Sequence, residues 1–186
     1  MSSATGIALP AAPARGLGRR ALDGLYEASM ALAALAMIGL LLMVLLSVLG
    51  RQVGWNVPGI DAHAGYLMAA CGFLALAGTL KRGEHIRVTL LLGTLSGTPR
   101  RAFEIGSLGL AALLAALSAF YAGRLVWQSW LFNDISTGND ATPLWIPQLA
   151  MVVGTVVLAI AFIDEFILEC RGLRAVPQSG EASHNE

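Results

Sequence analysis

The chain has 186 residues, of which 56% are hydrophobic and 13% are charged, and its 12 basic residues balance its 12 acidic ones. A soluble domain carries about twice that fraction of charge, and a neutral chain has no electrostatic attraction to nucleic acid, so the composition argues against both classes. The charges cluster between long uncharged stretches, which indicates an integral membrane protein.

The chain begins with a segment of small and polar residues, 1–24, which we predict to be a flexible cytoplasmic leader. Four stretches without Asp, Glu, Lys or Arg follow: Ala28–Gly50, Ala62–Leu80, Ile105–Gly123 and Ala141–Ile163. As helices they would extend about 29–35 Å, which matches a hydrocarbon core of about 30 Å. We therefore predict an all-α domain over residues 25–171, with transmembrane helices at about 28–50, 62–80, 105–123 and 143–163 and a disordered cytoplasmic tail at 172–186.

The basic residues predict how these helices are oriented. Ten of the 12 lie on the side that holds both termini and the loop between the second and third spans. The other side has only Arg51 and Arg124. Because basic residues are retained in the cytoplasm, we predict that both termini and the middle loop are cytoplasmic (N-in/C-in).

Arg51 and Arg124 oppose this trend, so each should have a local reason to be there. One explanation is that their side chains reach toward lipid headgroups. The hypothesis that we favour is pairing with an acid on a nearby loop: Asp61 for Arg51, and Asp134 or Asp140 for Arg124.

The middle loop is predicted to contain a short interfacial helix at about 86–96. Val88, Leu91, Leu92 and Leu95 fall on one side of this segment, and Arg87 lies on another. Such a pattern suits a helix that lies at the cytoplasmic surface of the bilayer.

The third span carries a row of small residues along one helix face. Its members are spaced three and four residues apart, so they lie on the same face of the helix. Small residues let helix backbones approach closely in a membrane. We predict a packing seam made of Gly109, Ala112, Ala116, Ala119 and Gly123. The pattern leaves open whether this seam meets a helix of the same chain or another subunit.

The spans contain little that could perform chemistry. Apart from tyrosine and cysteine, His63 is the only ionisable side chain within them, and Cys71 and Cys170 lie at different depths. We therefore predict no enzyme activity, no metal or cofactor, and no substrate site. Two alternatives stay open: a small stand-alone exporter, which would need a mid-membrane carboxylate, and a membrane anchor of a redox complex, which would need paired histidines.

Several motifs resemble the small membrane subunit (DctQ type) of TRAP (tripartite ATP-independent periplasmic) transporters. They are Lys81-Arg82-Gly83-Glu84-His85-Ile86-Arg87-Val88 after the second span, Ser136-Thr137-Gly138, and Thr142-Pro143-Leu144-Trp145-Ile146-Pro147, with Arg51 and Trp55 at the end of the first span. The chain departs from the family before the second span, where Asp61 takes one acidic place and Ala62 and Gly65 occupy other charged positions.

The resemblance implies a multi-pass subunit of the bacterial inner membrane. It would scaffold the large membrane subunit, which imports organic acids or related solutes by symport with an ion, and it would help receive the periplasmic solute-binding protein. The partners would thus be these two proteins and the lipid bilayer. The residues that we predict to contact a partner are Arg51, Trp55, Asp61, Glu84, His85, Arg87, Arg124, Ser136, Thr137, Trp145 and Pro147.

Overall fold

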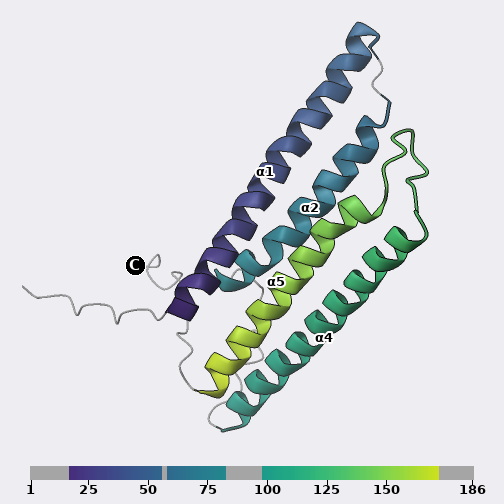
Figure 1. Ribbon diagram of the computed structural model, residues 1–186. Coiled ribbons are helices and arrows are strands. Elements are labelled where there is room, and N and C mark those ends of the chain that lie inside the picture. Colours follow the sequence, from purple (N-terminus) through teal and green to yellow (C-terminus); the bar gives the residue numbers. More distant parts are fainter. Residues whose placement is uncertain (1–16, 56–57, 83–97, 172–186) are drawn as a thin grey trace, which may run out of the picture.

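The computed structural model of the chain describes residues 17–55, 58–82 and 98–171 (Figure 1). Four helices make up most of them: α1 (Leu17–Val53), α2 (Ile60–Lys81), α4 (Thr98–Leu131) and α5 (Trp145–Cys170). All four are long and apolar enough to cross a membrane. The described residues contain no β-strand, only an isolated antiparallel bridge between Ile135 and Pro143. The prediction of an all-α protein with four membrane-spanning helices is therefore confirmed, whereas the predicted interfacial helix at 86–96 lies outside the described residues.

The helices do not end where the uncharged stretches end. α1 has 37 residues and α4 has 34, so they are about 55 and 50 Å long, well beyond the thickness of a bilayer core. α5 begins at Trp145 and not at residue 143, because Pro143 and Leu144 pair with the preceding loop. Uncharged stretches locate a span, whereas the helix continues for as long as neighbouring residues stabilise it.

The start of α1 corrects the predicted leader. Residues 17–24, which the sequence places in a flexible segment, form the first turns of the helix. Arg19 lies 3.9 Å from Asp23, one turn further along, and its guanidinium donates to Asp164 of α5 at 3.1 Å. Leu22 packs against the buried core. These contacts explain why the segment is helical although its composition resembles that of a leader.

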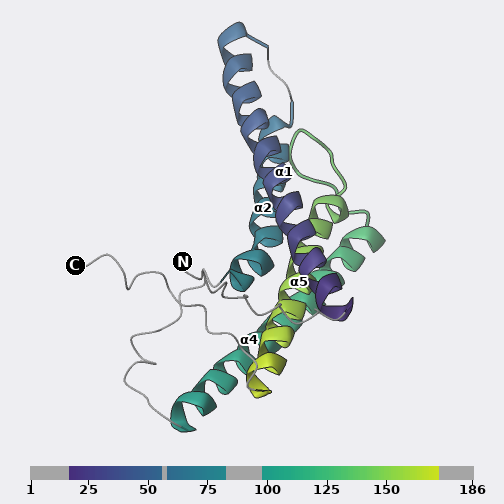
Figure 2. The ribbon, with the colours of Figure 1, turned by 90° about the vertical axis from the view of Figure 1, so that its left-hand side faces the viewer.

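The helices lie in a row in the order α1, α2, α5, α4, and do not close into a bundle (Figure 1). α2 and α5 are the inner pair, while α1 and α4 form the two edges of the row. Figure 2 shows that the α1–α2 pair is inclined to the α4–α5 pair, so the row is twisted. An open row of this kind leaves both of its faces uncovered along most of their length.

Small residues allow the inner contacts. Gly154 of α5 lies against the backbone of Phe73 in α2, where a Cβ atom would come within 2.5 Å of the Phe73 carbonyl group. On the other side of α2, the Ser29 hydroxyl of α1 donates to the Leu74 carbonyl oxygen at 2.6 Å. The buried hydrophobic residues are few and mostly small, and Tyr26, Ala77, Val157 and Ala161 form a cluster among them. The large apolar side chains mostly point outward, as in a protein surrounded by lipid or by other subunits.

The two ends of the row differ in character. Both described ends of the chain lie at one end, together with the exits to the α2–α4 connection, and we refer to it as the terminal end (Figure 1). The α1–α2 and α4–α5 loops lie at the opposite end, the loop end. Four tryptophans, Trp55, Trp127, Trp130 and Trp145, occupy helix termini or a loop at the loop end. Tryptophan concentrates at membrane–water interfaces, so this belt marks where the loop end leaves the hydrocarbon core.

Candidate functional site

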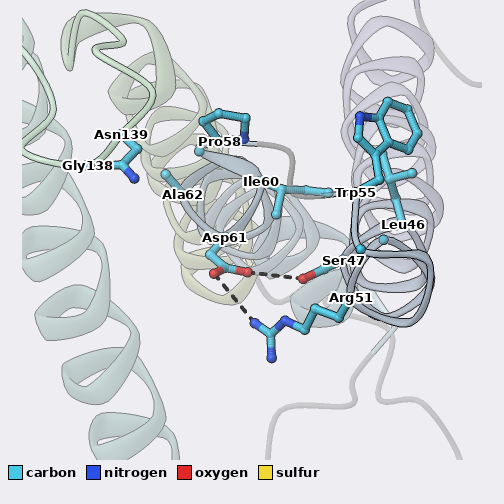
Figure 3. A pocket seen from close by; sticks show the side chains of 13 residues that line it. Leu46, Ser47, Arg51, Trp55, Pro58, Ile60, Asp61, Ala62, Gly138 and Asn139 are labelled. Atoms are coloured by element: carbon cyan, nitrogen blue, oxygen red, sulfur yellow. Dashed lines mark hydrogen bonds and ion pairs between the residues drawn. The ribbon is translucent and has the colours of Figure 1, made fainter.

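A hollow of about 580 Å³ opens at the loop end, between the last turns of α1, the start of α2 and residues 138–139 (Figure 3). Arg51 and Asp61 point toward one another across it, with 4.0 Å between the guanidinium nitrogen and the carboxylate oxygen. The Ser47 hydroxyl lies 3.4 Å from the other carboxylate oxygen of Asp61. The predicted pairing of Arg51 with Asp61 is therefore present. The two side chains are 77% and 81% exposed, so the pair contributes at most about 1 kcal/mol to stability and stays available to a partner.

The chain turns sharply where α1 meets this hollow. The Trp55 amide donates to the Gly50 carbonyl at 2.8 Å, and Gly54 has a φ of 74°, a conformation that glycine adopts without strain. A Cβ atom at Gly50 would lie 2.5 Å from the Trp55 carbonyl oxygen. The two glycines thus permit a turn that leaves the Trp55 side chain 64% exposed at the rim.

The α4–α5 loop beside the hollow is closed by its own hydrogen bonds. The Ser136 amide donates to the Thr142 carbonyl at 2.9 Å, and the Leu144 amide donates to the Asp134 carbonyl at 3.0 Å. The Asp140 carboxylate then accepts from the Ser136 hydroxyl at 2.8 Å and from the Tyr66 hydroxyl of α2 at 3.0 Å. Asp140 therefore joins the loop to α2.

Hydrogen bonding also sets the ionisation of Asp140. Donation from the side chains of Thr142, Ser136 and Tyr66 lowers the pKa of this carboxyl to about 2. The group is thus ionised at neutral pH and holds the loop as an anion. Gly59 makes room for it, because a Cβ atom there would lie 2.7 Å from that of Asp140.

The structure gathers only some of the predicted contact residues. Arg51, Trp55 and Asp61 line one hollow, and Ser136 and Thr137 lie on the loop that borders it. Trp145 and Pro147 are half-buried in the first turn of α5. Glu84, His85 and Arg87 lie outside the described residues.

Arg124 lies apart from this hollow, exposed on α4 well before the helix ends at Leu131. In the part of the chain that the structure describes, it forms no ion pair with Asp134 or Asp140. Asp140 is instead held by Tyr66 and Ser136.

The predicted seam on α4 flanks the face that packs on α5. The buried positions of α4 are Leu108, Ala115, Ala122 and Ser129, one every seven residues. Among the seam residues, Ala116 is exposed and the other four are half-buried. A Cβ atom at Gly109 would lie 3.3 Å from the Phe166 ring of α5, whereas one at Gly123 would have nothing within 4 Å. Within this chain, α5 therefore covers only part of the seam and leaves the rest exposed.

A cluster of charges at the terminal end joins three helices. Lys81 of α2 contacts both Asp164 and Glu165 of α5, with 3.1 Å to the Glu165 carboxylate. Arg19 of α1 contacts both carboxylate oxygens of Asp164 at 3.1 Å. The ammonium group of Lys81 also lies 5.0 Å from the centre of the Tyr26 ring. The Lys81, Asp164 and Glu165 side chains are only 14–16% exposed, so this cluster fixes the terminal ends of the helices relative to one another.

Sequence reasoning missed this cluster and the Tyr66–Asp140 contact. The cluster had a signal, because Lys81 and Asp164 are the first charges after the second and fourth uncharged stretches, on the same side of the membrane. The Tyr66–Asp140 contact had none, since nothing in the sequence brings these two residues together.

Histidine and cysteine serve no common site in the described residues. His63 lies 2.9 Å, through Nδ1, from the Gly59 carbonyl oxygen one turn earlier, and its ring meets that of Tyr66 edge-on. Within the described ranges, no group of three or more His, Cys, Asp or Glu side chains could hold a metal ion.

A comparison with protein families gives one finding for the chain as a whole. A family model described as "Tripartite ATP-independent periplasmic transporters, DctQ component" matches residues 40–172. No curated protein matches the chain. The matched range covers well over half of the chain and includes the loop-end hollow, the closed α4–α5 loop and the seam.

Proposed function

The chain belongs to the DctQ family, a membrane component of TRAP transporters, and on this basis we propose that it scaffolds the large membrane subunit of such a transporter. In this proposal the large subunit binds the solute and the coupling ion. A periplasmic protein delivers the solute, an organic acid or a related compound. The family is one of transporter components, not of enzymes.

The open row of helices is the observation that supports scaffolding most directly. α1 packs mainly on α2, and α4 packs on α5, so each edge helix keeps much of its apolar surface free. Leu35 and Leu49 of α1 are 64% and 60% exposed. Lipid can cover such surfaces, but membrane helices also associate through packing faces rich in small residues. The seam of α4 offers one face of this kind, and we propose that it meets a helix of the large subunit.

The terminal end carries most of the described basic residues, so we propose that it faces the cytoplasm of the bacterial inner membrane. The loop-end hollow then faces the periplasm. Its exposed Arg51–Asp61 pair and the rim residue Trp55 are available to the binding protein. Rim charges of this kind mainly speed and orient docking and add little to final affinity.

Capture of the large subunit tests the proposal. An affinity-tagged chain, co-expressed with the large subunit of its transporter and extracted in mild detergent, should retain that subunit in a fixed ratio. Purification of the chain without any large multi-span partner would contradict the scaffolding role.

Two neighbouring alanines provide a matched pair of variants for this experiment. Ala115 is buried against α5, whereas Ala116 is exposed on the seam. Ala115→Leu should lower the thermal stability of the isolated chain through overpacking, by about 1–3 kcal/mol. Ala116→Leu should leave that stability unchanged and reduce the captured large subunit. Full capture by Ala116→Leu would remove the seam from the interface.

A further inference from the structure

A second hollow, of about 530 Å³, runs along α4 where it faces α5 and α2. Its α4 wall extends from Ser118 to Gln128, about 15 Å along the helix axis. α5 contributes Met151 and Thr155 to the opposite wall, and α2 contributes Phe73. We refer to it as the α4 groove. It is distinct from the hollow at the loop end and lies on the side of the helices.

Arg124 is the unusual member of this groove. It lies seven residues before the end of α4, or about 10 Å along the helix axis, and about one turn below Trp127 in the tryptophan belt. An arginine in a membrane span is costly unless its charge is matched. Within the described residues Arg124 forms no ion pair, so nothing in this part of the chain neutralises its charge.

The polarity of the groove changes along its length. Arg124 and Gln128, both donors, line the part nearest the loop end. Tyr121 of α4 and Phe73 of α2, which lies against Gly154, line the part nearer the middle of the membrane. The hydroxyl groups of Ser118 and Thr155 donate to carbonyl groups of their own helices, at 2.9 and 2.8 Å, and so add little polarity there.

We propose that the α4 groove binds a phospholipid of the loop-end leaflet. The phosphate accepts hydrogen bonds from Arg124 and Gln128, and an acyl chain lies along Phe73 and Tyr121. A phosphate is available to an arginine just below the tryptophan belt, and a guanidinium binds it in a two-pronged geometry. The polar-to-apolar order of the groove matches that of a lipid entering from its headgroup side.

The groove does not compete with the seam. At 100° per residue, Ser118, Tyr121 and Leu125 lie on one flank of the buried line of α4, and the seam residues Ala112, Ala116 and Gly123 lie on the other. The lipid proposal therefore stands whether or not the seam contacts the large subunit.

Photo-crosslinking tests the proposal. The full chain, purified with whatever subunits accompany it, is reconstituted with phosphatidylglycerol that carries a diazirine on one acyl chain, and the labelled peptides are mapped by mass spectrometry. Label should concentrate on groove residues such as Tyr121 and Met151. Arg124→Gln should reduce it about fivefold, the change expected from the loss of one cationic contact with an anionic headgroup.

Three controls make this result specific. Arg124→Lys should retain most of the label, because the positive charge remains. Arg51→Gln, which removes the other loop-end arginine, should leave groove labelling unchanged. A diazirine diacylglycerol, which lacks the phosphate, should label the groove weakly. All variants are compared at equal amounts of monodisperse protein on gel filtration, so that misfolding is not counted as lost binding.

Two outcomes would overturn the proposal. One is labelling that is spread evenly over the exposed leucines of α1 and α4, or groove labelling that Arg124→Gln does not change. The other is an Arg124→Gln variant that keeps its groove label but loses the large subunit, which would identify a protein carboxylate as the partner of Arg124.

Discussion

The contact between α2 and α5 joins the two halves of the row, and Gly154 gives the sharpest way to perturb it. A Cβ atom at this position would lie 2.5 Å from the carbonyl carbon and oxygen of Phe73 and 2.8 Å from its Cβ atom. Ordinary contact begins near 3.4 Å. Gly154→Ala therefore forces the two helices about 1 Å apart. Overpacking of this kind costs about 1–3 kcal/mol, and widening the contact forfeits part of the dispersion energy along the interface.

For a chain of this size, a loss of about 2 kcal/mol lowers the midpoint of thermal unfolding by about 4–8 °C. The midpoint can be measured in detergent with a dye that reacts with half-buried Cys71 as the helices separate, in a Cys170→Ser background. Gly106→Ala is the matched control, because a Cβ atom there meets nothing within 4 Å and alanine favours the helix by about 1 kcal/mol. Equal midpoints for Gly154→Ala and the wild type would refute the close approach of α2 and α5.

Three further predictions follow from the two ends of the row. Lys81→Met removes the ammonium group that Asp164 and Glu165 share, and it should lower the free energy of unfolding by about 3 kcal/mol. Arg19→Met removes a side chain that is 37% exposed and should lower it by only about 1 kcal/mol. Equal losses for the two variants in thermal unfolding would contradict the difference in burial between Lys81 and Arg19. Because the pKa of Asp140 is lowered to about 2 from an ordinary value of 3.8, its stabilisation of the α4–α5 loop should persist down to about pH 4 and weaken as the pH falls toward 2. Cleavage of the loop by pepsin should therefore increase over that pH range. The role of Asp140 would be contradicted if the resistance of the loop to pepsin did not vary with pH, or if Tyr66→Phe left this resistance intact. Orientation can be tested with single cysteines in a background without Cys71 and Cys170. Cysteines that replace Trp55 and Asn139 should react with an impermeant thiol reagent in intact cells, whereas one that replaces Thr94 should not. Labelling at position 94 would reverse the proposed orientation.

The four helices could be predicted from the sequence because a bilayer imposes one strong requirement. A helix that crosses the hydrocarbon core must be free of charge over about 20 residues, and the chain contains four such stretches. The pair of Arg51 with Asp61 was also predictable, because a single short loop separates these residues. Both inferences depend on features that are local in the sequence.

The order of the helices in the row could not be predicted in the same way. Small residues occur on several faces of these helices, so their positions do not say which face meets which neighbour. Ala115 and Ala116 are adjacent and alike in sequence, yet one is buried and the other exposed. The proposed partner of Arg124 failed for a related reason: Asp140 is close in sequence, but a hydroxyl group from α2 already binds it.

Reconstituted transport tests the central claim most directly. The large membrane subunit is placed in proteoliposomes with and without this chain, the periplasmic binding protein is loaded with its solute, and uptake is measured under an ion gradient. We expect uptake only when both membrane subunits are present. We also expect an unchanged solute preference when this chain is exchanged for that of a relative serving another solute. Equal uptake without this chain, or a solute preference that follows it, would contradict the proposed scaffolding role.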